Sequence, residues 1–163
     1  MKFAPLPANE KERIDVVQKM GILDTDREDR FDAITQEAKE KLKVPMSTIT
    51  IMDTDREWFK SYQGLEEREG PRKTSFCGHA LVVDDIFIVE DTLKDERFMD
   101  NPMVIGEPFV RFYAGVALRD RKYKTGLPVG VFCVKDTKPR KFELDEINIL
   151  LDLASKAEIE LNK

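Results

Sequence analysis

The run from Ser75 to Ala80 holds the two side chains best suited to chemistry, Cys77 and His79. Ser75 is a preferred helix-capping residue, and a helix that begins after it would place Cys77 in its first turn. Unpaired backbone N–H groups and the helix dipole lower the pKa of a thiol there, which makes it more reactive. His79 is not the activating base in such a helix, because residues two apart point in nearly opposite directions. The alternative is that Cys77 is a small buried side chain without chemistry.

Cys133 and the single histidine complete the material for thiol or metal chemistry. Cys133 falls in an apolar stretch, so we expect it in the core. The two cysteines are far apart in the sequence, and in a reducing compartment both are expected to be free thiols. The spacing of Cys77, His79 and Cys133 matches no zinc motif, so we expect no metal site.

Arg111 is the cation best suited to hold a ligand. It precedes two aromatic residues on a predicted strand, and a guanidinium there can bind a carboxylate or a phosphate. The alternative is an ion pair with Asp91 or Asp100 that fixes the loop. His79 is equally suited to bind a ligand and to fix a loop, since it titrates near neutral pH.

A ligand site needs a concave surface on which a few polar groups converge. The turn at residues 75–79, the loop at 91–101 and the strand at 111–113 bring polar residues, aromatic residues and flexible backbone together. We expect a small anionic ligand there, held by Arg111 and by N–H groups at the start of the helix after Ser75. Aromatic residues at alternate strand positions are more often ordinary core, which is the alternative for this set. The predicted ligand-binding residues are Phe59, Phe76, Cys77, His79, Asp91, Asn101, Arg111 and Tyr113.

The overall composition excludes several classes of protein. The chain has 163 residues and a formal net charge of −5, which disfavours binding to the phosphate backbone of nucleic acids. No apolar run approaches the roughly 18 residues of a membrane span, and the first residues lack the apolar core of a signal peptide. We therefore expect a cytoplasmic protein with no nucleic-acid or membrane partner. The length fits one domain with a full hydrophobic core.

Apolar residues at helical spacing predict helices towards both ends of the chain. Ile14 and Val17 mark the first helix, with Asn9 as its expected cap. A second helix is expected to follow a capping box at residues 25–28, and a long helix covers residues 143–161.

Between these helices the apolar pattern changes to the alternation of β-strands. Residues 65–108 hold long irregular connections, which are more often functional than idle. Short connections favour antiparallel pairing, and the terminal helices must cover the sheet, so the predicted class is α+β with one central sheet. The predicted strands are residues 48–52, 58–62, 86–90, 110–118 and 128–134.

Seven short phrases fall in a characteristic order along the chain. They are Gly21-Ile22-Leu23-Asp24-Thr25, Arg30-Phe31-Asp32, Trp58-Phe59-Lys60, Ser75-Phe76-Cys77-Gly78-His79-Ala80, Asp100-Asn101-Pro102, Arg111-Phe112-Tyr113-Ala114-Gly115-Val116-Ala117-Leu118 and Gly130-Val131-Phe132-Cys133-Val134. Together they resemble the GAF domain family, in the form found before bacterial sensor kinases and cyclic-dinucleotide enzymes.

The resemblance implies a single domain over residues 1–163, with a core of about 9–157. It also implies an antiparallel sheet of about six strands with the N- and C-terminal helices packed on one face. A ligand pocket would lie on the other face, roofed by short helices and loops from residues 65–108. Fold alone does not fix the ligand, because GAF domains bind unrelated molecules.

The function implied by the resemblance is that of a sensory module that binds a small molecule and has no output catalysis of its own. Cyclic-nucleotide-binding members carry an Asn-Lys signature, and the Asn-Lys pair here, Asn162-Lys163, is at the C-terminus. Bilin-binding members attach their chromophore through a pocket cysteine, which Cys77 and His79 match only in part. Members that reduce free methionine sulfoxide use several pocket cysteines, so a Cys77-dependent thiol enzyme is the alternative function, with Cys133 a poor second cysteine. The identity of the ligand and of any cofactor is not fixed by the sequence.

Output is expected outside this chain, because it has no phosphate-binding glycine loop and no kinase motif. We therefore expect a signalling partner or an output domain. The last helix carries Ile149 and Leu153 outside its main apolar stripe, and this extra width predicts a homodimer through the terminal helices. The alternative is a wide buried face against the first helix.

Overall fold

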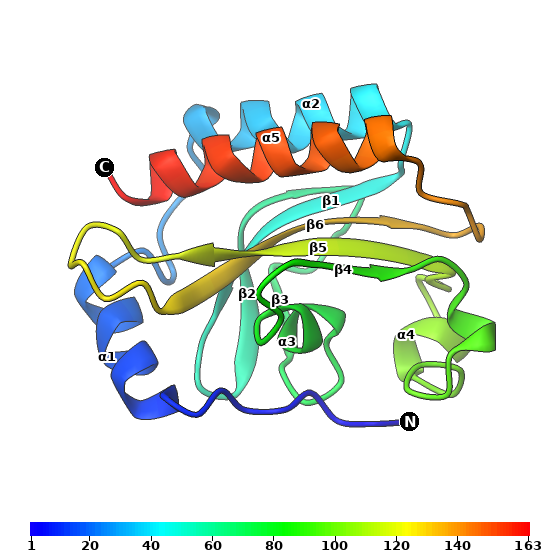
Figure 1. Cartoon of the computed structure of the whole chain (residues 1–163), viewed down its shortest axis with the longest axis horizontal. Coiled ribbons are helices and arrows are strands. Elements are labelled where there is room, and N and C mark those ends of the chain that lie inside the picture. Colours follow the sequence, from blue (N-terminus) through cyan, green and yellow to red (C-terminus); the bar gives the residue numbers. More distant parts are fainter.

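A six-stranded antiparallel sheet forms the centre of the computed structural model, which describes residues 1–163 (Figure 1). The strands lie in the order β3-β2-β1-β6-β5-β4. They are β1 (Met46–Met52), β2 (Arg56–Gln63), β3 (Glu69–Pro71), β4 (Ile86–Val89), β5 (Phe112–Arg119) and β6 (Pro128–Asp136). The helices are α1 (Glu10–Met20), α2 (Asp29–Leu42), α3 (Phe76–Ala80), α4 (Pro102–Ile105), α5 (Leu144–Leu161) and the short 3-10 helix η1 (Thr92–Lys94). None of these helices combines the length and the apolar character needed to cross a bilayer.

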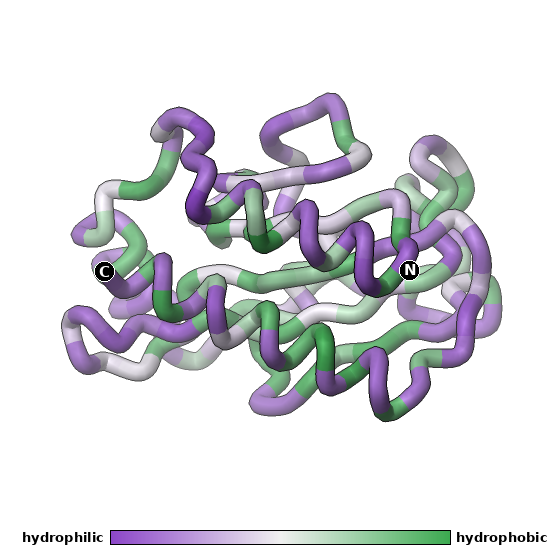
Figure 2. Tube along the Cα trace, turned by 90° about the horizontal axis from the view of Figure 1, so that it is seen from above, coloured by the Kyte–Doolittle hydropathy of each residue, from purple (hydrophilic) through white to green (hydrophobic).

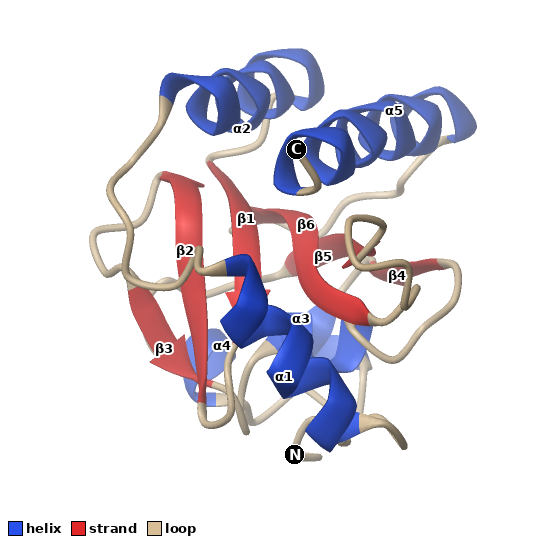
Figure 3. Cartoon of the chain, turned by 90° about the vertical axis from the view of Figure 1, so that its left-hand side faces the viewer, coloured by secondary structure: helices blue, strands red, loops and turns tan.

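Helices α2 and α5 lie side by side over one face of the sheet (Figures 1 and 3). Hydrophilic and hydrophobic residues alternate along their turns, as the view from above shows (Figure 2). Phe31 and Ala38 of α2 and Leu150 and Ala157 of α5 are among the buried residues of the core between helices and sheet. This arrangement confirms the predicted α+β fold with a six-stranded antiparallel sheet.

The first helix, α1, lies at one end of the sheet and contacts β6 (Figure 1). Its Arg13 side chain is fully buried, and Nη1 donates a hydrogen bond to the carbonyl oxygen of Met52 at 2.7 Å. Glu10 accepts from Arg13 at 2.8 Å and from Arg72 at 2.6 Å. Of the two N-terminal helices, only α2 therefore shares the face of the sheet with α5, while ionic contacts fix α1 to the ends of β1 and β3.

The opposite face of the sheet carries α3, α4 and η1 (Figure 1). Alternation along β6 separates the two cores, since Phe132 and Val134 belong to the cluster under α2 and α5, whereas Val131 and Cys133 belong to a second cluster under α3. This second cluster is built largely from the segment that the sequence predicted to roof a pocket.

The helix caps confirm one prediction and correct two. Ser75 caps α3, and its Oγ accepts from the backbone N–H of Gly78 at 2.9 Å. The expected capping box at residues 25–28 is wrong, because α2 begins at Asp29 and the hydroxyl of Thr25 donates to a carbonyl in its own turn. Asn9 stands before α1 without a capping hydrogen bond from its side chain.

One strand was not predicted. Strand β3 contains only three residues, with sequence Glu-Gly-Pro, and pairs with β2 at the edge of the sheet. Glycine and proline are both unfavourable in strands, so the segment has the composition of a loop. Its pairing matters because β3 forms one wall of the pocket described below.

Candidate functional site

A pocket of about 570 Å³ opens on the face of the sheet opposite α2 and α5. Strands β2 and β3, the segment between them, and α4 with the residues after it surround this pocket, and β6 contributes one residue. The lining residues are Glu57, Phe59, Gly64, Leu65, Glu66, Glu67, Glu69, Gly70, Pro71, Thr74, Pro102, Met103, Glu107, Pro108 and Lys135.

Two buried side chains of opposite charge, Glu57 on β2 and Lys135 on β6, form the floor of this pocket. Each is only 2% exposed. The Oε1 atom of Glu57 has no hydrogen-bond partner, and the Lys135 ammonium forms no hydrogen bond or ion pair with the protein. The floor therefore offers one acceptor and one donor that the protein leaves unused.

Burial affects the protonation of both floor residues. Burial raises the pKa of Glu57, although the charge of Lys135 and the neighbouring Cys77 thiol oppose this. Burial also disfavours the charge of Lys135, but the nearby Cys133 and Glu57 outweigh it and raise the pKa of Lys135. Lys135 therefore remains a cation at neutral pH.

The rim of the pocket is acidic, and one wall is apolar. Lys135 is the single basic residue in the lining, against four exposed glutamates, and a field of this sign attracts cations and repels anions. These carboxylates form no cluster suited to a metal ion. Phe59, Leu65 and Met103 form the apolar wall, so the pocket includes Phe59 of the predicted site residues. The four rim glutamates are Glu66, Glu67, Glu69 and Glu107.

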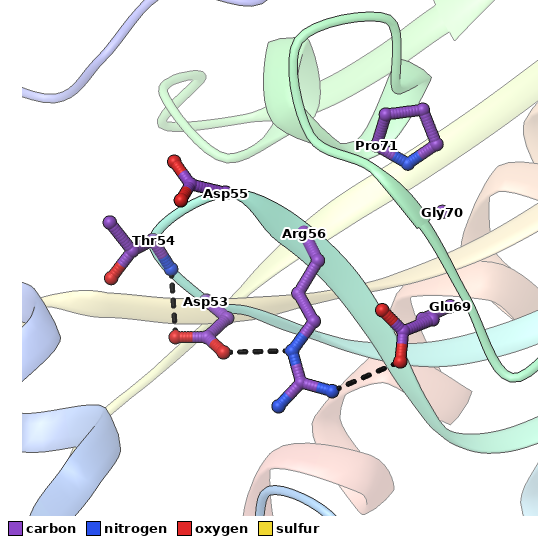
Figure 4. Close-up of a pocket in the computed structure, with 7 residues that line it drawn as sticks. All are labelled: Asp53, Thr54, Asp55, Arg56, Glu69, Gly70 and Pro71. Carbon is purple, nitrogen blue, oxygen red and sulfur yellow. Dashed lines mark hydrogen bonds and ion pairs between the residues drawn. The ribbon is translucent and has the colours of Figure 1, made fainter.

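A second, open hollow of about 630 Å³ adjoins the pocket at β3 (Figure 4). Its single cation, Arg56, contacts Asp53 at 2.8 Å, Asp24 at 2.7 Å and Glu69 at 3.2 Å. Asp24 contributes most to the rise in the pKa of Arg56, followed by Asp53. Pro71 is the only residue of this hollow with an apolar ring, and the guanidinium of Arg56 is already paired, so we assign no ligand to it.

Cys77 lies in the first turn of α3 and is fully buried in the second core. The hydroxyl of Tyr113 donates to its sulfur at 3.1 Å, and its own thiol donates to the hydroxyl of Thr50 at 3.7 Å. Burial raises the pKa of Cys77, and the neighbouring Cys133 raises it further. The expected low pKa is therefore wrong, because burial outweighs the effect of a helix of only five residues.

Cys133 lies beside Cys77, although the two are far apart in the sequence. Both are free thiols with no exposed surface. Burial raises the pKa of Cys133, but the neighbouring Cys77 thiol, the charge of Lys135 and the hydroxyl of Thr48 together lower it to about 7. Cys133 is in the core, as predicted, and its closeness to Cys77 was missed.

His79 and Phe76 pack within an aromatic cluster of the second core. Phe76 stacks against Phe98 and Tyr113, with ring centroids 4.3 and 5.2 Å apart. His79 meets the Phe98 ring edge-on at 4.8 Å, and its Nε2 lies 3.3 Å from the carbonyl oxygen of Lys2. Burial lowers the pKa of His79. These side chains fix α3 to the sheet.

Arg111 holds α4 in place through a backbone acceptor. Its Nη1 donates to the carbonyl oxygen of Val104 at 2.7 Å. The expected alternative, an ion pair with Asp91 or Asp100, is wrong, because Asp100 instead pairs with the amino group of Met1 at 2.6 Å. Arg111 thus contacts the loop, as in the alternative to ligand binding, but through a backbone carbonyl and not through an aspartate.

Asp91 and Asn101 are helix caps. Asp91 caps η1 by accepting from the N–H of Leu93 at 3.1 Å. Asn101 caps α4, and its amide also donates to the carbonyl oxygen of Thr74 at 2.9 Å. Neither residue lines the pocket, nor do Phe76, Cys77, His79, Arg111 and Tyr113. Ligand binding by these seven residues stays a prediction.

A family model described as a GAF domain matches residues 26–161. The chain belongs to the GAF domain family. The six-stranded sheet with α2 and α5 on one face, and the pocket on the other, agree with the arrangement that the resemblance implied.

This GAF domain is similar to part of a larger signalling enzyme and to several solved domains. It is 39% identical over 140 residues to a cyclic di-GMP phosphodiesterase of Pseudomonas aeruginosa, a match that covers 86% of this chain and 23% of that protein. The GAF domain of an Acinetobacter phosphoenolpyruvate-protein phosphotransferase has a TM-score of 0.65, 18% identity and 92% coverage of both chains. A type II free methionine-R-sulfoxide reductase from Thermoplasma acidophilum has a TM-score of 0.63 and 15% identity, over 91% of this chain and 94% of that one. At these identities the two solved structures show the fold alone.

Sequence reasoning about this GAF domain found Phe59 but missed Glu57 and Lys135. A signal for both lies in the alternation of the strands. Glu57 and Phe59 flank the buried Trp58, and Lys135 follows Cys133 at the same inward spacing. A charged residue at an inward strand position is rare unless it is paired, and this exception marks a candidate site.

Proposed function

We propose that this GAF domain binds a small molecule in the pocket over Glu57 and Lys135 and reports its occupancy to another protein or domain. The observation that carries the proposal is a pair of buried side chains at the floor of a concave site: the Oε1 atom of Glu57 has no hydrogen-bond partner, and the Lys135 ammonium makes no hydrogen bond or ion pair with the protein. Buried polar groups are nearly always satisfied, so an unsatisfied pair facing a pocket favours a bound ligand. The volume of about 570 Å³ suits a small organic molecule.

The roof of the pocket could transmit ligand binding to another protein or domain. Helix α4 has only four residues, and its Met103 lines the pocket while its Val104 accepts from Arg111. A short helix held by few contacts opens at low free energy, and a ligand that contacts it shifts that equilibrium. We therefore propose that the position of α4 is the readout of binding.

The output catalysis is proposed to lie outside these residues. The Pseudomonas aeruginosa relative is named as a cyclic di-GMP phosphodiesterase, and the chain spans 23% of its length. We propose a regulatory function for the matched part and leave the phosphodiesterase activity to the rest of that relative. A signalling partner or an output domain is the expected receiver.

The Cys77-dependent thiol enzyme is supported less well. A thiol nucleophile must be exposed and must have a lowered pKa, whereas Cys77 is fully buried and burial raises its pKa. The likeness to methionine sulfoxide reductases is one of fold. We also propose a cytoplasmic location, on the ground that two free thiols suit a reducing compartment.

A homodimer through the terminal helices is proposed with a revised surface. Leu153 is buried in the core, so it is not part of an exposed second face. Leu144, Leu151 and Ile159 of α5 are 71%, 38% and 59% exposed. They form the apolar surface that a second copy would cover, and sedimentation at high micromolar concentration tests it, with a monomer counting against the dimer.

The test of ligand binding combines native mass spectrometry of the purified chain with a thermal-shift screen of small metabolites. We expect a compound that raises the melting temperature and that binds at least tenfold more weakly to Met103→Trp, which fills the pocket. Ile105→Trp is the matched control, because Ile105 lies on the same helix, is 65% exposed and does not line the pocket. A compound that binds equally to both variants, or a screen without any binder, contradicts the proposal.

A further inference from the structure

The floor of the pocket specifies more than the presence of a ligand. Glu57 and Lys135 attract one another, yet no ion pair within 4.0 Å joins them. Desolvated charges are costly unless each finds an opposite charge and hydrogen bonds. A molecule that lies between them and satisfies both must offer an acceptor to the Lys135 ammonium and a donor to the Glu57 carboxylate.

The rim restricts the net charge of that molecule. The lining contains five glutamates and one lysine. A ligand with net negative charge would gain one contact at Lys135 and approach against four exposed carboxylates. A simple cation would satisfy Glu57 but would bring a like charge towards Lys135 and leave its ammonium without an acceptor. The earlier expectation of an anionic ligand therefore does not suit this pocket.

The apolar residues of the lining indicate the chemical character of the part of the ligand that joins its two charged groups. Phe59, Leu65 and Met103 are the apolar residues of the lining and present an aromatic ring, a branched aliphatic chain and a thioether. These groups offer dispersion and hydrophobic contact and no further hydrogen-bond donor from their side chains. A short hydrocarbon body fits this wall.

We propose that the pocket binds a small aliphatic zwitterion, with its carboxylate on the Lys135 ammonium and its own ammonium on the Glu57 carboxylate. This inference rests on the proposed function, since it names the ligand class of the same pocket. Full charges at both ends of the ligand compensate both buried charges, which a neutral amide would do less well.

The first experiment tests the charge requirement on the unaltered protein. Isothermal titration calorimetry is run with L-leucine, 4-aminobutyrate and 6-aminohexanoate. The singly charged analogues are 4-methylpentanoate and 3-methylbutylamine for leucine, butyrate and butylamine for 4-aminobutyrate, and hexanoate and hexylamine for 6-aminohexanoate. We expect at least one zwitterion to bind tenfold or more tightly than each analogue that lacks one of its charges. Binding of an amine or a carboxylate as tight as that of the best zwitterion overturns the proposal.

The second experiment tests which protein residue binds each charged end of the zwitterion. Lys135→Met and Glu57→Gln each remove one charge and keep the approximate length of the side chain, and each is expected to weaken the best zwitterion at least tenfold. Lys138→Met and Glu12→Gln are the controls, because both parent side chains are exposed and outside the pocket, and no change is expected. If a floor variant unfolds, as circular dichroism would show, the analogue series on the unaltered protein still decides the question.

The outcomes separate this inference from the proposed function. If none of the zwitterions binds but the metabolite screen yields another compound that Met103→Trp excludes, the pocket is a ligand site of a different class and the present inference is wrong. If neither the zwitterions nor the screen yields a binder, both proposals fail. Unchanged affinity of the zwitterion in both floor variants also overturns the assignment of its two ends.

Discussion

The two faces of this sheet are packed by different means. Under α2 and α5, 23 buried apolar residues form one continuous cluster, and the two helices have 14 and 18 residues. On the other face, 14 apolar residues pack below helices of five and four residues, next to the buried charges of Glu57 and Lys135. Long helices with a largely apolar interface give stability, whereas short elements beside unsatisfied polar groups leave room for a ligand and for movement.

The difference predicts unequal losses for one substitution made on each face. Phe31 on α2 has no exposed surface, and Phe31→Ala should lower the free energy of unfolding by about 3–5 kcal/mol. Phe59 borders empty volume in the pocket and belongs to neither apolar cluster, so Phe59→Ala should cost about 3 kcal/mol or less, because fewer contacts are lost. Urea denaturation measures both values.

Ligand affinity should show the opposite order for these two variants. Phe59→Ala should weaken the binding of any pocket ligand severalfold, and Phe31→Ala should leave affinity unchanged in the fraction that remains folded. Equal losses of stability from the two substitutions would mean that the faces do not differ as described.

The next prediction concerns the hydrogen bond between Arg111 and α4. Arg111→Ala removes a hydrogen bond from a guanidinium to the Val104 carbonyl, and such charge-assisted bonds contribute about 1.5–3 kcal/mol. We expect faster amide hydrogen exchange in residues 102–106 with little change in α2 and α5. Arg97→Ala is the control, because Arg97 is 40% exposed and pairs with Asp95.

The same variant decides between two functions of Arg111. If it contacts ligand directly, Arg111→Ala should weaken binding without faster exchange in α4. If it positions α4, both effects should appear together, and restoring a donor with Arg111→Lys should recover part of each. If amide hydrogen exchange in α4 is as slow in Arg111→Ala as in the unaltered protein, Arg111 does not position this helix.

The helix-covered face could be predicted from the sequence because periodicity alone specifies it. Phe31, Ile34, Ala38 and Leu42 repeat at helical spacing, and the strands beneath alternate regularly, so each local pattern agrees with the final packing. Strand β3 could not be predicted, because three residues with glycine and proline have no strand propensity and pair only through the edge of β2.

The candidate site was harder to predict, because tertiary packing decides which side chains line the pocket. Cys77, His79 and Arg111 have the reactive groups that attract attention in a sequence, yet their contacts are structural. Glu57 and Lys135 are ordinary residue types, and only the fold shows that both are buried and that they form no ion pair with each other. The family resemblance implied a pocket on the face opposite the long helices, which is where the pocket lies, and its position on that face depends on the course of β3 and α4.

A smaller effect tests the ionic contact between α1 and the ends of β1 and β3. Burial raises the pKa of Glu10, but hydrogen bonds from Arg72 and Arg13 lower it to about 2. A carboxyl group with a lowered pKa contributes stability that is complete above its ordinary pKa of 4.5 and is lost as the pH falls towards 2. Glu10→Gln should therefore cost about 1 kcal/mol at neutral pH, allowing for solvent screening, and almost nothing near pH 2.

Denaturation at several pH values measures this difference. Glu12→Gln on the same helix is the control, because Glu12 is exposed and has no resolved contact, and its effect should be near zero throughout. A cost of Glu10→Gln that stays constant between neutral pH and pH 2.5 would show that the contact is not ionic.

The smallest expected effect is that of the two buried thiols on ligand affinity. Cys77 accepts from Tyr113 and lies beside Cys133, yet neither cysteine lines the pocket. Cys77→Ser keeps a polar hydrogen-bonding group at nearly the same position, so ligand affinity should change by less than about twofold. In the folded protein neither thiol should react with Ellman's reagent faster than the chain unfolds, because both are fully buried and only an exposed thiolate reacts rapidly. Cys133→Ser is the matched control, and it should behave in the same way. The contrary result would be that the purified chain reduces methionine sulfoxide, that Cys77→Ser abolishes this activity, and that the affinity for the pocket ligand is unchanged. The thiol enzyme would then be the better supported of the two candidate functions, with Cys77 as its catalytic residue.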